Sequence, residues 1–257
     1  MKTLFVALVL VLSQMIAVGQ DQQEYYQLKK YTINSEYQEK IVDDFLEKAY
    51  LPALHRLGIE NIGVFKPVEN KSDSLTHIYV LIPFSTLDQY AELDSKLASD
   101  AKFQKDGSGY LELPNENPAY ERMESTLLIA FEDMPQMRKP DFATERKSRV
   151  YELRSYESAT EKLGENKVDM FNAGGEITLF ENLGFNAVFY GKVISGSSMP
   201  NLMYMTTFSD KESRDAHWKQ FVESPVWIKM KSLPKYDIGN VSHIDIHFLY
   251  PTEYSDY

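Results

Sequence analysis

The sequence contains no cysteine among its 257 residues. This absence excludes disulfide bonds, thiolate metal sites, a cysteine nucleophile and a lipid-modified cysteine. Basic residues are also scarce relative to acidic ones: 27 Lys and Arg stand against 38 Asp and Glu, for a formal net charge of -11. A nucleic-acid partner requires a basic face, and an anionic membrane surface repels an acidic protein. We therefore expect neither kind of partner.

Common nucleotide-binding and hydrolase motifs are also absent. The sequence has no P-loop, G-x-S-x-G elbow, H-E-x-x-H pair or G-x-G-x-x-G loop. It does have a hydrophobic fraction of 43%, which is ample for a packed core and excludes wholesale disorder. The sequence therefore predicts a folded protein, and no motif in it assigns a cofactor or a reaction.

One long apolar run is present, near the N-terminus. Lys2 precedes residues 4–18, an apolar segment of about 15 residues, whereas a membrane span needs ~20. A basic residue, a short apolar segment and the small residues of Ala17-Val18-Gly19 are typical of a secretory signal peptide. We predict a signal peptide over residues 1–19, export to the periplasm or the cell exterior, and no stable membrane anchor after cleavage before Gln20.

The remainder of the chain reads as two copies of one unit. YYQLKKY at 25–31 recurs as VYELRSY at 150–156, and IYVLIPFS at 78–85 recurs as LMYMTTFS at 202–209, at offsets of 125 and 124. Similar segments in one order at one offset indicate an internal repeat. We predict a first repeat over 20–132, a linker over 133–147 and a second repeat over 148–257.

Each repeat shows the same order of predicted elements. Ser35 followed by Gln38 is a capping box that opens a helix, and Ser85 with Asp88 and Ser209 with Glu212 are similar capping signals for the second helices. Strand-like alternation predicts the strands 24–31, 61–68, 76–84, 126–131, 149–156, 185–194, 201–208 and 243–250. The resulting β-α-β-β-α-β order is the ferredoxin-like split unit.

A single ferredoxin-like sheet carries helices on only one face, so its other face must be covered. Two repeats in one chain can satisfy this requirement by packing sheet against sheet with the helices outside. The sequence therefore predicts an α+β fold, an intrachain, pseudo-dimeric α/β barrel.

The second repeat resembles the NIPSNAP family. The resemblance rests on VYELRSY, DMFNAGGEITLFENLGF and LMYMTTFSDKESRDAHWKQFVESPVW, and it covers about 150–250, with a looser match in the first repeat. It implies the dimeric α/β-barrel fold and a sheet-lined cavity, but no settled reaction. Related barrels include cofactor-free monooxygenases, haem-handling enzymes, and small cyclases and isomerases.

Alternation places a polar set on one face of the strand at 149–156. Tyr151 and Leu153 share one face, and Glu152, Arg154 and Tyr156 share the other. If the first pair packs on the helices, the polar set points into the barrel, where Glu152 can serve as an acid or base. The predicted ligand-binding residues, for an anionic or phenolic ligand, are Arg154, Tyr156, Tyr204, Lys29 and Tyr31. The alternative is that Glu152 and Arg154 simply form an ion pair.

The last strand presents His243, Asp245 and His247 on one face. The two histidines can bind one metal ion, or Asp245 can orient a general-base histidine. A third interpretation is a polar, half-exposed edge strand. With Glu152, these three are the candidate catalytic residues.

Two classes of function follow from the sequence. The first is a small-molecule binder, with or without catalysis, and the second is a non-catalytic interaction module. An enclosed pocket containing Arg154, Tyr156 or Tyr204 favours the first class, and a barrel interior filled by Phe, Tyr and Met favours the second. The sequence also permits a homo-oligomer.

Overall fold

The computed structural model of the protein describes residues 22–68, 75–140 and 142–257. The predicted signal peptide at 1–19 lies outside the described residues. Within the described part of the chain, no helix is long and apolar enough to cross a membrane.

The first repeat has the predicted β-α-β-β-α-β order, with the helical segments subdivided. Ser35 Oγ accepts a hydrogen bond from the Gln38 amide at 3.3 Å, as the capping box predicts, and the helical stretch ends before Gly58, which adopts a φ of 75°. Its elements are β1 (Tyr25–Ile33), α1 (Glu36–Phe45), the π-helical segment η2 (Leu46–Tyr50), α2 (Leu51–Arg56), β2 (Gly63–Pro67), β3 (Thr76–Phe84), α3 (Leu87–Ser99), α4 (Ala101–Asp106), α5 (Ser108–Leu111) and β4 (Arg122–Ala130).

The second repeat follows the same order. Gly175, with a φ of 85°, separates its first two helices, and Gly184, with a φ of 78°, follows the second. Its elements, after a short 3-10 helix η3 (Arg146–Ser148), are β5 (Val150–Glu157), α6 (Glu161–Phe171), α7 (Glu176–Asn182), β6 (Asn186–Ser195), β7 (Asn201–Phe208), α8 (Lys211–Glu223), α9 (Pro225–Lys231) and β8 (His243–Pro251).

Some element boundaries differ from the predicted ones. The N-caps of α3 and α8 are Thr86 and Asp210, one residue after the predicted serines, and their side chains accept from the Gln89 and Ser213 amides at 3.1 and 2.7 Å. β4 begins at Arg122 rather than at residue 126, because it pairs with β1 along nearly its whole length.

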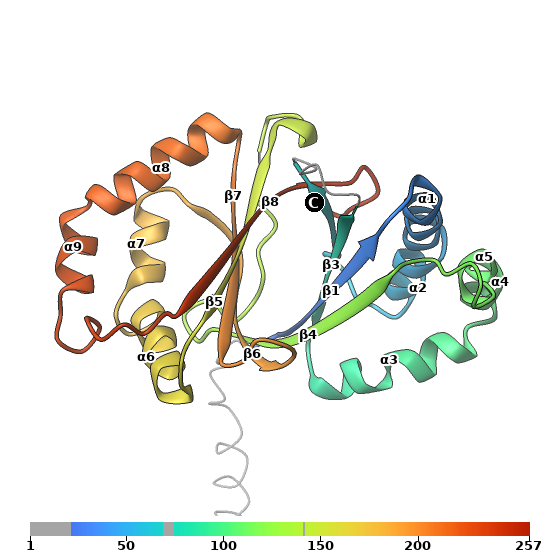
Figure 1. Cartoon of the computed structure of the whole chain (residues 1–257), viewed down its shortest axis with the longest axis horizontal. Helices are drawn as coiled ribbons and strands as arrows, with labels where there is room; N and C mark the ends of the chain where they lie inside the picture. The colour runs from blue at the N-terminus through green and yellow to red at the C-terminus, as the bar shows by residue number, and fades with distance from the viewer. Residues whose placement is uncertain (1–21, 69–74, 141) are drawn as a thin grey trace, which may run out of the picture.

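The eight strands form one closed antiparallel barrel in the order β1-β3-β2-β8-β5-β7-β6-β4. Each repeat contributes four strands, and the two sheets join at the β2–β8 and β6–β4 pairs. The helices of the two repeats lie on opposite sides of this barrel (Figure 1). The predicted fold, two ferredoxin-like repeats packed sheet to sheet, is confirmed.

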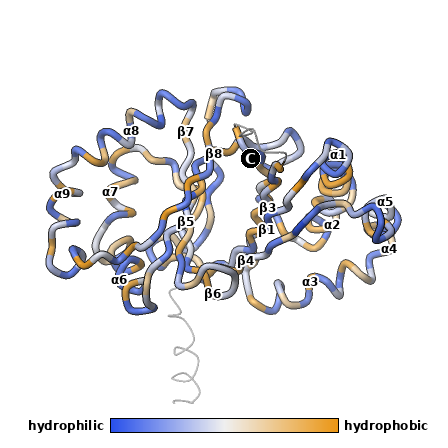
Figure 2. Tube along the Cα trace, viewed as in Figure 1, coloured by the Kyte–Doolittle hydropathy of each residue, from blue (hydrophilic) through white to orange (hydrophobic). Residues whose placement is uncertain are grey.

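Large apolar side chains fill most of the barrel interior. Apolar positions recur along the strands, and the outer helices alternate between apolar and hydrophilic positions (Figure 2). Two further apolar clusters lie between the sheets and their helices. The buried residues of the interior include Tyr26, Leu28, Phe65, Tyr79, Leu81, Leu128, Tyr151, Leu153, Val188, Phe189, Met205, Leu249 and Tyr257.

The strand faces are oriented opposite to the sequence-based interpretation. Tyr151 and Leu153 point into the barrel, so Glu152, Arg154 and Tyr156 face the helices. A closed eight-stranded barrel has an interior just wide enough for side chains to fill, and aromatic residues from both sheets occupy it here. The helix layer, in contrast, provides partners for a buried carboxylate. The prediction that this polar set points into the barrel was therefore wrong.

Candidate functional site

A buried ionic network lies between β5 and α8. The carboxylate of Glu152, with none of its surface exposed, accepts hydrogen bonds from Arg154 Nε at 2.8 Å and from Trp218 Nε1 at 2.7 Å. Arg214 donates to both carboxylate oxygens, through Nε at 2.8 Å and Nη2 at 2.6 Å. Glu152 is thus saturated with donors, and the ion pair that the sequence offered as the alternative is present.

The sequence of α8 explains how these partners reach Glu152. Arg214 and Trp218 are four residues apart on one helix, so their side chains project from the same face. The Arg154 guanidinium lies 3.6 Å from the centre of the Trp218 ring, a cation–π contact that fixes its plane.

The charges in this network determine the ionisation of Glu152. Burial alone raises a carboxyl pKa, but the hydrogen bond from Arg214 and the positive charges of Arg154 and Arg214 lower the pKa of Glu152 below its ordinary value. Glu152 is therefore a carboxylate at neutral pH that holds two guanidinium groups in place.

The network continues into a pair of tyrosines. Arg154 Nη1 donates to Tyr156 Oη at 2.9 Å, and Tyr156 Oη lies 2.9 Å from Tyr204 Oη. Burial, together with the neighbouring Tyr156, raises the pKa of Tyr204 well above its ordinary value. The polar chain thus runs from α8 along the sheet to Tyr156.

Tyr156 is also part of the wall of a cavity of about 360 Å³, which we call the α6 groove. The groove lies beside α6 and the β6–β7 connection. Lys192 and Glu165 form an ion pair at its rim, and Gly164 permits close approach, because a Cβ there would lie 3.2 Å from Pro200 Cβ. The lining residues are Tyr156, Ser158, Glu161, Gly164, Glu165, Val168, Lys192, Val193, Ile194, Met199, Pro200, Asn201 and Leu202.

A second cavity, of about 120 Å³, lies on the barrel-facing side of the strands, and we call it the barrel mouth. Lys30 and Glu124 form an ion pair there at 2.5 Å, and the ring of His247 lies 5.6 Å from that of Tyr79. Its lining residues are Leu28, Lys30, Tyr79, Glu124, Thr126, Leu153, Ser155, Glu157, Ser197, Ser198, Asn201, Met203, Asp245 and His247.

The structure divides the predicted site residues into three places. Arg154, Tyr156 and Tyr204 come together beside Glu152, between the sheet and the helices. His243, Asp245 and His247 lie on β8. Asp245 and His247 line the barrel mouth, and His243 Nε2 lies 3.1 Å from Asp245 Oδ1.

The two candidates from the first repeat lie elsewhere. Lys29 Nζ donates to Tyr50 Oη at 2.9 Å, and the buried Tyr31 packs edge-on against Tyr120. Both contact residues of the helical layer of the first repeat. That layer and the helices of the second repeat lie on opposite sides of the barrel (Figure 1).

Three residues of these sites were missed from the sequence. Arg214 and Trp218 complete the Glu152 network, and Glu157 lies beside His243. The only sequence signal for Arg214 and Trp218 is their i, i+4 spacing on an otherwise polar helix. The only signal for Glu157 is that its carboxylate follows Tyr156 in sequence. Neither signal specifies a partner on a distant strand.

Comparisons with known proteins are consistent with this architecture. The NIPSNAP family model matches residues 151–256. No curated protein matches the sequence significantly.

Several solved structures share the overall arrangement. A proposed monooxygenase from Lactobacillus acidophilus NCFM has a TM-score of 0.54 at 12% identity, over 89% of this chain and 94% of that chain. A proposed monooxygenase from Fusobacterium nucleatum has a TM-score of 0.55 at 7% identity, over 90% of this chain and 93% of that chain. An anthrone oxidase-like protein has a TM-score of 0.55 at 10% identity, over 92% of this chain and 94% of that chain.

At these identities the similarity shows the fold alone. Each match nonetheless extends over both repeats, so the whole chain shares the fold of these structures. The part of the chain that is similar to the NIPSNAP family, residues 151–256, is most of the second repeat.

Proposed function

We propose that this protein binds a small, largely apolar molecule that carries a hydroxyl or carbonyl group, and that it does so in the α6 groove. The observation that carries the proposal is the groove itself, with a volume of about 360 Å³ and Tyr156 in its wall. Small-molecule sites are typically clefts of ~300–1,000 Å³ with mostly apolar walls and a few fixed polar groups. Val168, Ile194 and Leu202 provide such a wall.

Tyr156 is the fixed polar group of this proposal. Its hydroxyl accepts from Arg154, whose own position is set by Glu152 and Trp218. When Tyr204 donates to Tyr156, the Tyr156 proton is available for an oxygen atom of the ligand. A side chain held in this way loses little conformational entropy on binding, which supports selectivity for one ligand orientation.

The proposed binding site, the α6 groove, lies on the helical side of the sheet and not in the barrel interior. The predicted sheet-lined cavity is largely occupied by aromatic residues, and about 120 Å³ remains at the barrel mouth. Some barrels of this fold are described as monooxygenases or as anthrone oxidase-like. That likeness makes an aromatic ligand a sensible first probe; the proposal itself is for binding.

Titration with 2-naphthol, an aromatic alcohol, tests this proposal by calorimetry. Ile194→Trp places a large side chain at the groove and should weaken binding at least about tenfold, equivalent to ~1.4 kcal/mol. Leu87→Trp is the matched control, because Leu87 is similarly exposed on α3 of the first repeat. Equal binding by the wild type and Ile194→Trp would refute the groove as the site.

A specific observation also favours the second class, an interaction module. The barrel interior is filled, and Val222, Val226 and Ile228 are exposed apolar residues on the adjoining helices α8 and α9. Light scattering measures whether the chain self-associates. If it does so through these residues, Val226→Glu should lower the measured mass. A monomeric wild-type protein that binds 2-naphthol would favour the groove instead.

Export remains part of the proposal. Lys2, the apolar run at 4–18 and Ala17-Val18-Gly19 support it. N-terminal sequencing of the exported protein should begin near Gln20. Recovery of the uncleaved chain from the cytosol would contradict this expectation.

A further inference from the structure

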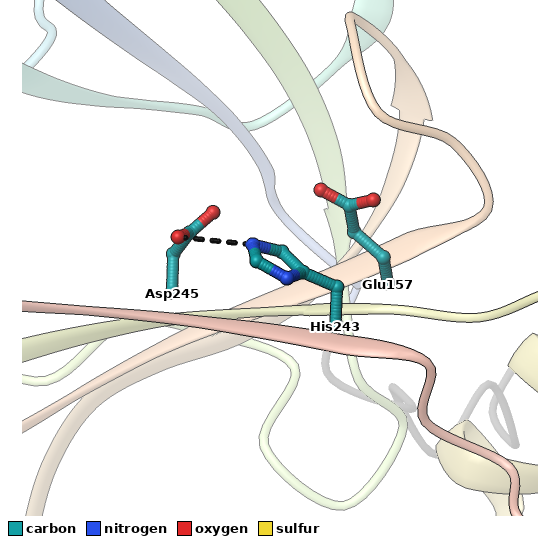
Figure 3. A group of neighbouring side chains, drawn as sticks. All are labelled: Glu157, His243 and Asp245. Atoms are coloured by element: carbon teal, nitrogen blue, oxygen red, sulfur yellow. Dashed lines mark hydrogen bonds and ion pairs between the residues drawn. The ribbon is translucent and has the colours of Figure 1, made fainter.

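Three potential metal ligands converge on the barrel side of β5 and β8. One ligand atom from each of Glu157, His243 and Asp245 lies within 4.8 Å of the other two. Figure 3 shows the three side chains rising from the same side of the two strands. This arrangement differs from the pair of histidines that the sequence suggested, because His247 lies farther along β8, against Tyr79.

The strand register explains this convergence. Glu157 and His243 are directly opposite each other in the β5–β8 ladder, and Asp245 is two residues along, on the same face. Ser242 holds the strand end by donating to the Glu157 carbonyl oxygen from its amide at 2.8 Å and from its hydroxyl at 3.1 Å. The backbone therefore fixes all three Cα positions, while the exposed His243 and Asp245 side chains remain able to rotate.

The charges around the cluster favour a cation. The barrel mouth holds three carboxylates, from Glu124, Glu157 and Asp245, and one ammonium group, from Lys30. Lys30 is already paired with Glu124 at 2.5 Å. Across the described ranges, no Lys or Arg side chain forms an ion pair with Glu157 or Asp245.

The first repeat provides an internal comparison. Thr32 and Arg122 occupy the paired positions that Glu157 and His243 occupy in the second repeat, and Glu124 corresponds to Asp245. A guanidinium and a hydroxyl thus stand where the second repeat has an imidazole and a carboxylate. The first repeat therefore lacks the histidine and the Glu157 carboxylate of this three-ligand group.

We propose that Glu157, His243 and Asp245 bind a divalent transition-metal ion of the Zn²⁺ class. An imidazole and two carboxylates suit Zn²⁺, Co²⁺ or Mn²⁺ better than soft, thiolate-preferring ions. Three protein ligands leave one coordination position open, as in catalytic zinc sites. The three ligand atoms lie within 4.8 Å of one another, and metal distances of ~2.0–2.2 Å require rotation of the exposed His243 and Asp245 side chains to bring them closer. The open position lies beside the barrel mouth, because Glu157 and Asp245 also line that cavity.

Calorimetric titration of the untagged chain with Zn²⁺ tests this inference, and Co²⁺ provides a visible absorption spectrum as a second readout. We expect one ion per chain. His243→Ala, Glu157→Gln and Asp245→Asn should each weaken binding at least about tenfold, the order of effect that loss of even an outer-shell partner produces.

His55→Ala is the matched control. His55 Nε2 lies 3.0 Å from Asp256 Oδ2, an exposed histidine–carboxylate pair like that of His243 and Asp245, but outside the three-ligand group. The His55→Ala substitution should leave the Zn²⁺ affinity and the Co²⁺ spectrum unchanged. Wild-type binding no tighter than about 1 mM, or an equal effect of His55→Ala and His243→Ala, would overturn the assignment. Thermal unfolding of each variant without metal checks that the fold is retained.

Discussion

The two repeats share a backbone plan and differ in what they bury between sheet and helices. In the first repeat, Lys29 meets a single tyrosine hydroxyl, and Tyr31 packs among aromatic rings. In the second, the equivalent Arg154 and Tyr156 belong to a chain of charged and phenolic groups that ends at a groove. The fold therefore does not determine the chemistry of this layer; a few substitutions on one strand and one helix do.

The helix that faces each sheet accounts for much of this difference. At the offset of 124, Tyr90 and Asp94 on α3 correspond to Arg214 and Trp218 on α8. Asp94 is exposed, whereas Trp218 is partly buried and donates to Glu152. Only the second repeat can thus neutralise a buried carboxylate from its helix.

The largest expected effect comes from breaking this network. Glu152→Gln should lower the free energy of unfolding by about 3–5 kcal/mol, because it leaves the buried Arg154 without a counter-charge and leaves Arg214 paired only with Asp215. The equivalent Gln27→Leu in the first repeat should cost only about 0.5–1.5 kcal/mol, the value of a neutral hydrogen bond to Ser125. Urea denaturation measures both variants, and equal losses would contradict the contrast between the repeats.

The pH dependence of stability should show the same contrast. Since the pKa of Glu152 is lower in the folded protein, its contribution is complete above the unfolded-state pKa of about 4.3 and is lost as the pH falls through the folded-state pKa. Wild-type stability should therefore fall more steeply below about pH 4.3 than that of Glu152→Gln. Parallel curves from urea denaturation between neutral pH and pH 3 would contradict this expectation.

A smaller effect is expected at the groove. Tyr156→Phe should weaken 2-naphthol binding by about 0.5–1.5 kcal/mol, since it removes one hydrogen-bonding group from the groove wall. Tyr31→Phe, at the equivalent position of the first repeat, should leave the affinity unchanged. Calorimetry compares the two variants, and a loss shared equally by both would indicate an indirect effect on the fold.

The architecture could be predicted from the sequence because repeat spacing and the alternation of apolar and polar residues can be seen in the sequence itself. It correctly grouped Glu152, Arg154 and Tyr156 on one face of a strand. It could not specify which face is interior, because that depends on how the aromatic residues of two sheets fill a closed barrel. The partner Arg214, 62 residues away from Glu152, is supplied by a tertiary contact that no local pattern encodes.

The cluster on the last strand, β8, was also only partly predictable from the sequence. Alternation correctly placed Asp245 and His247 on one face of the strand, where both line the barrel mouth, and His243 lies beside Asp245. The third member of the proposed metal site, Glu157, is found only from the pairing register of β5 and β8. Register is set by the turn geometry and packing of the whole sheet, which the sequence alone does not fix.

A crystal structure of the protein with 2-naphthol would locate the bound ligand. We expect electron density for the ligand in the α6 groove, with its hydroxyl oxygen within hydrogen-bonding distance of Tyr156 Oη. Density confined to the barrel mouth or to the first repeat, or no density at a ligand concentration that saturates the calorimetric titration, would contradict it.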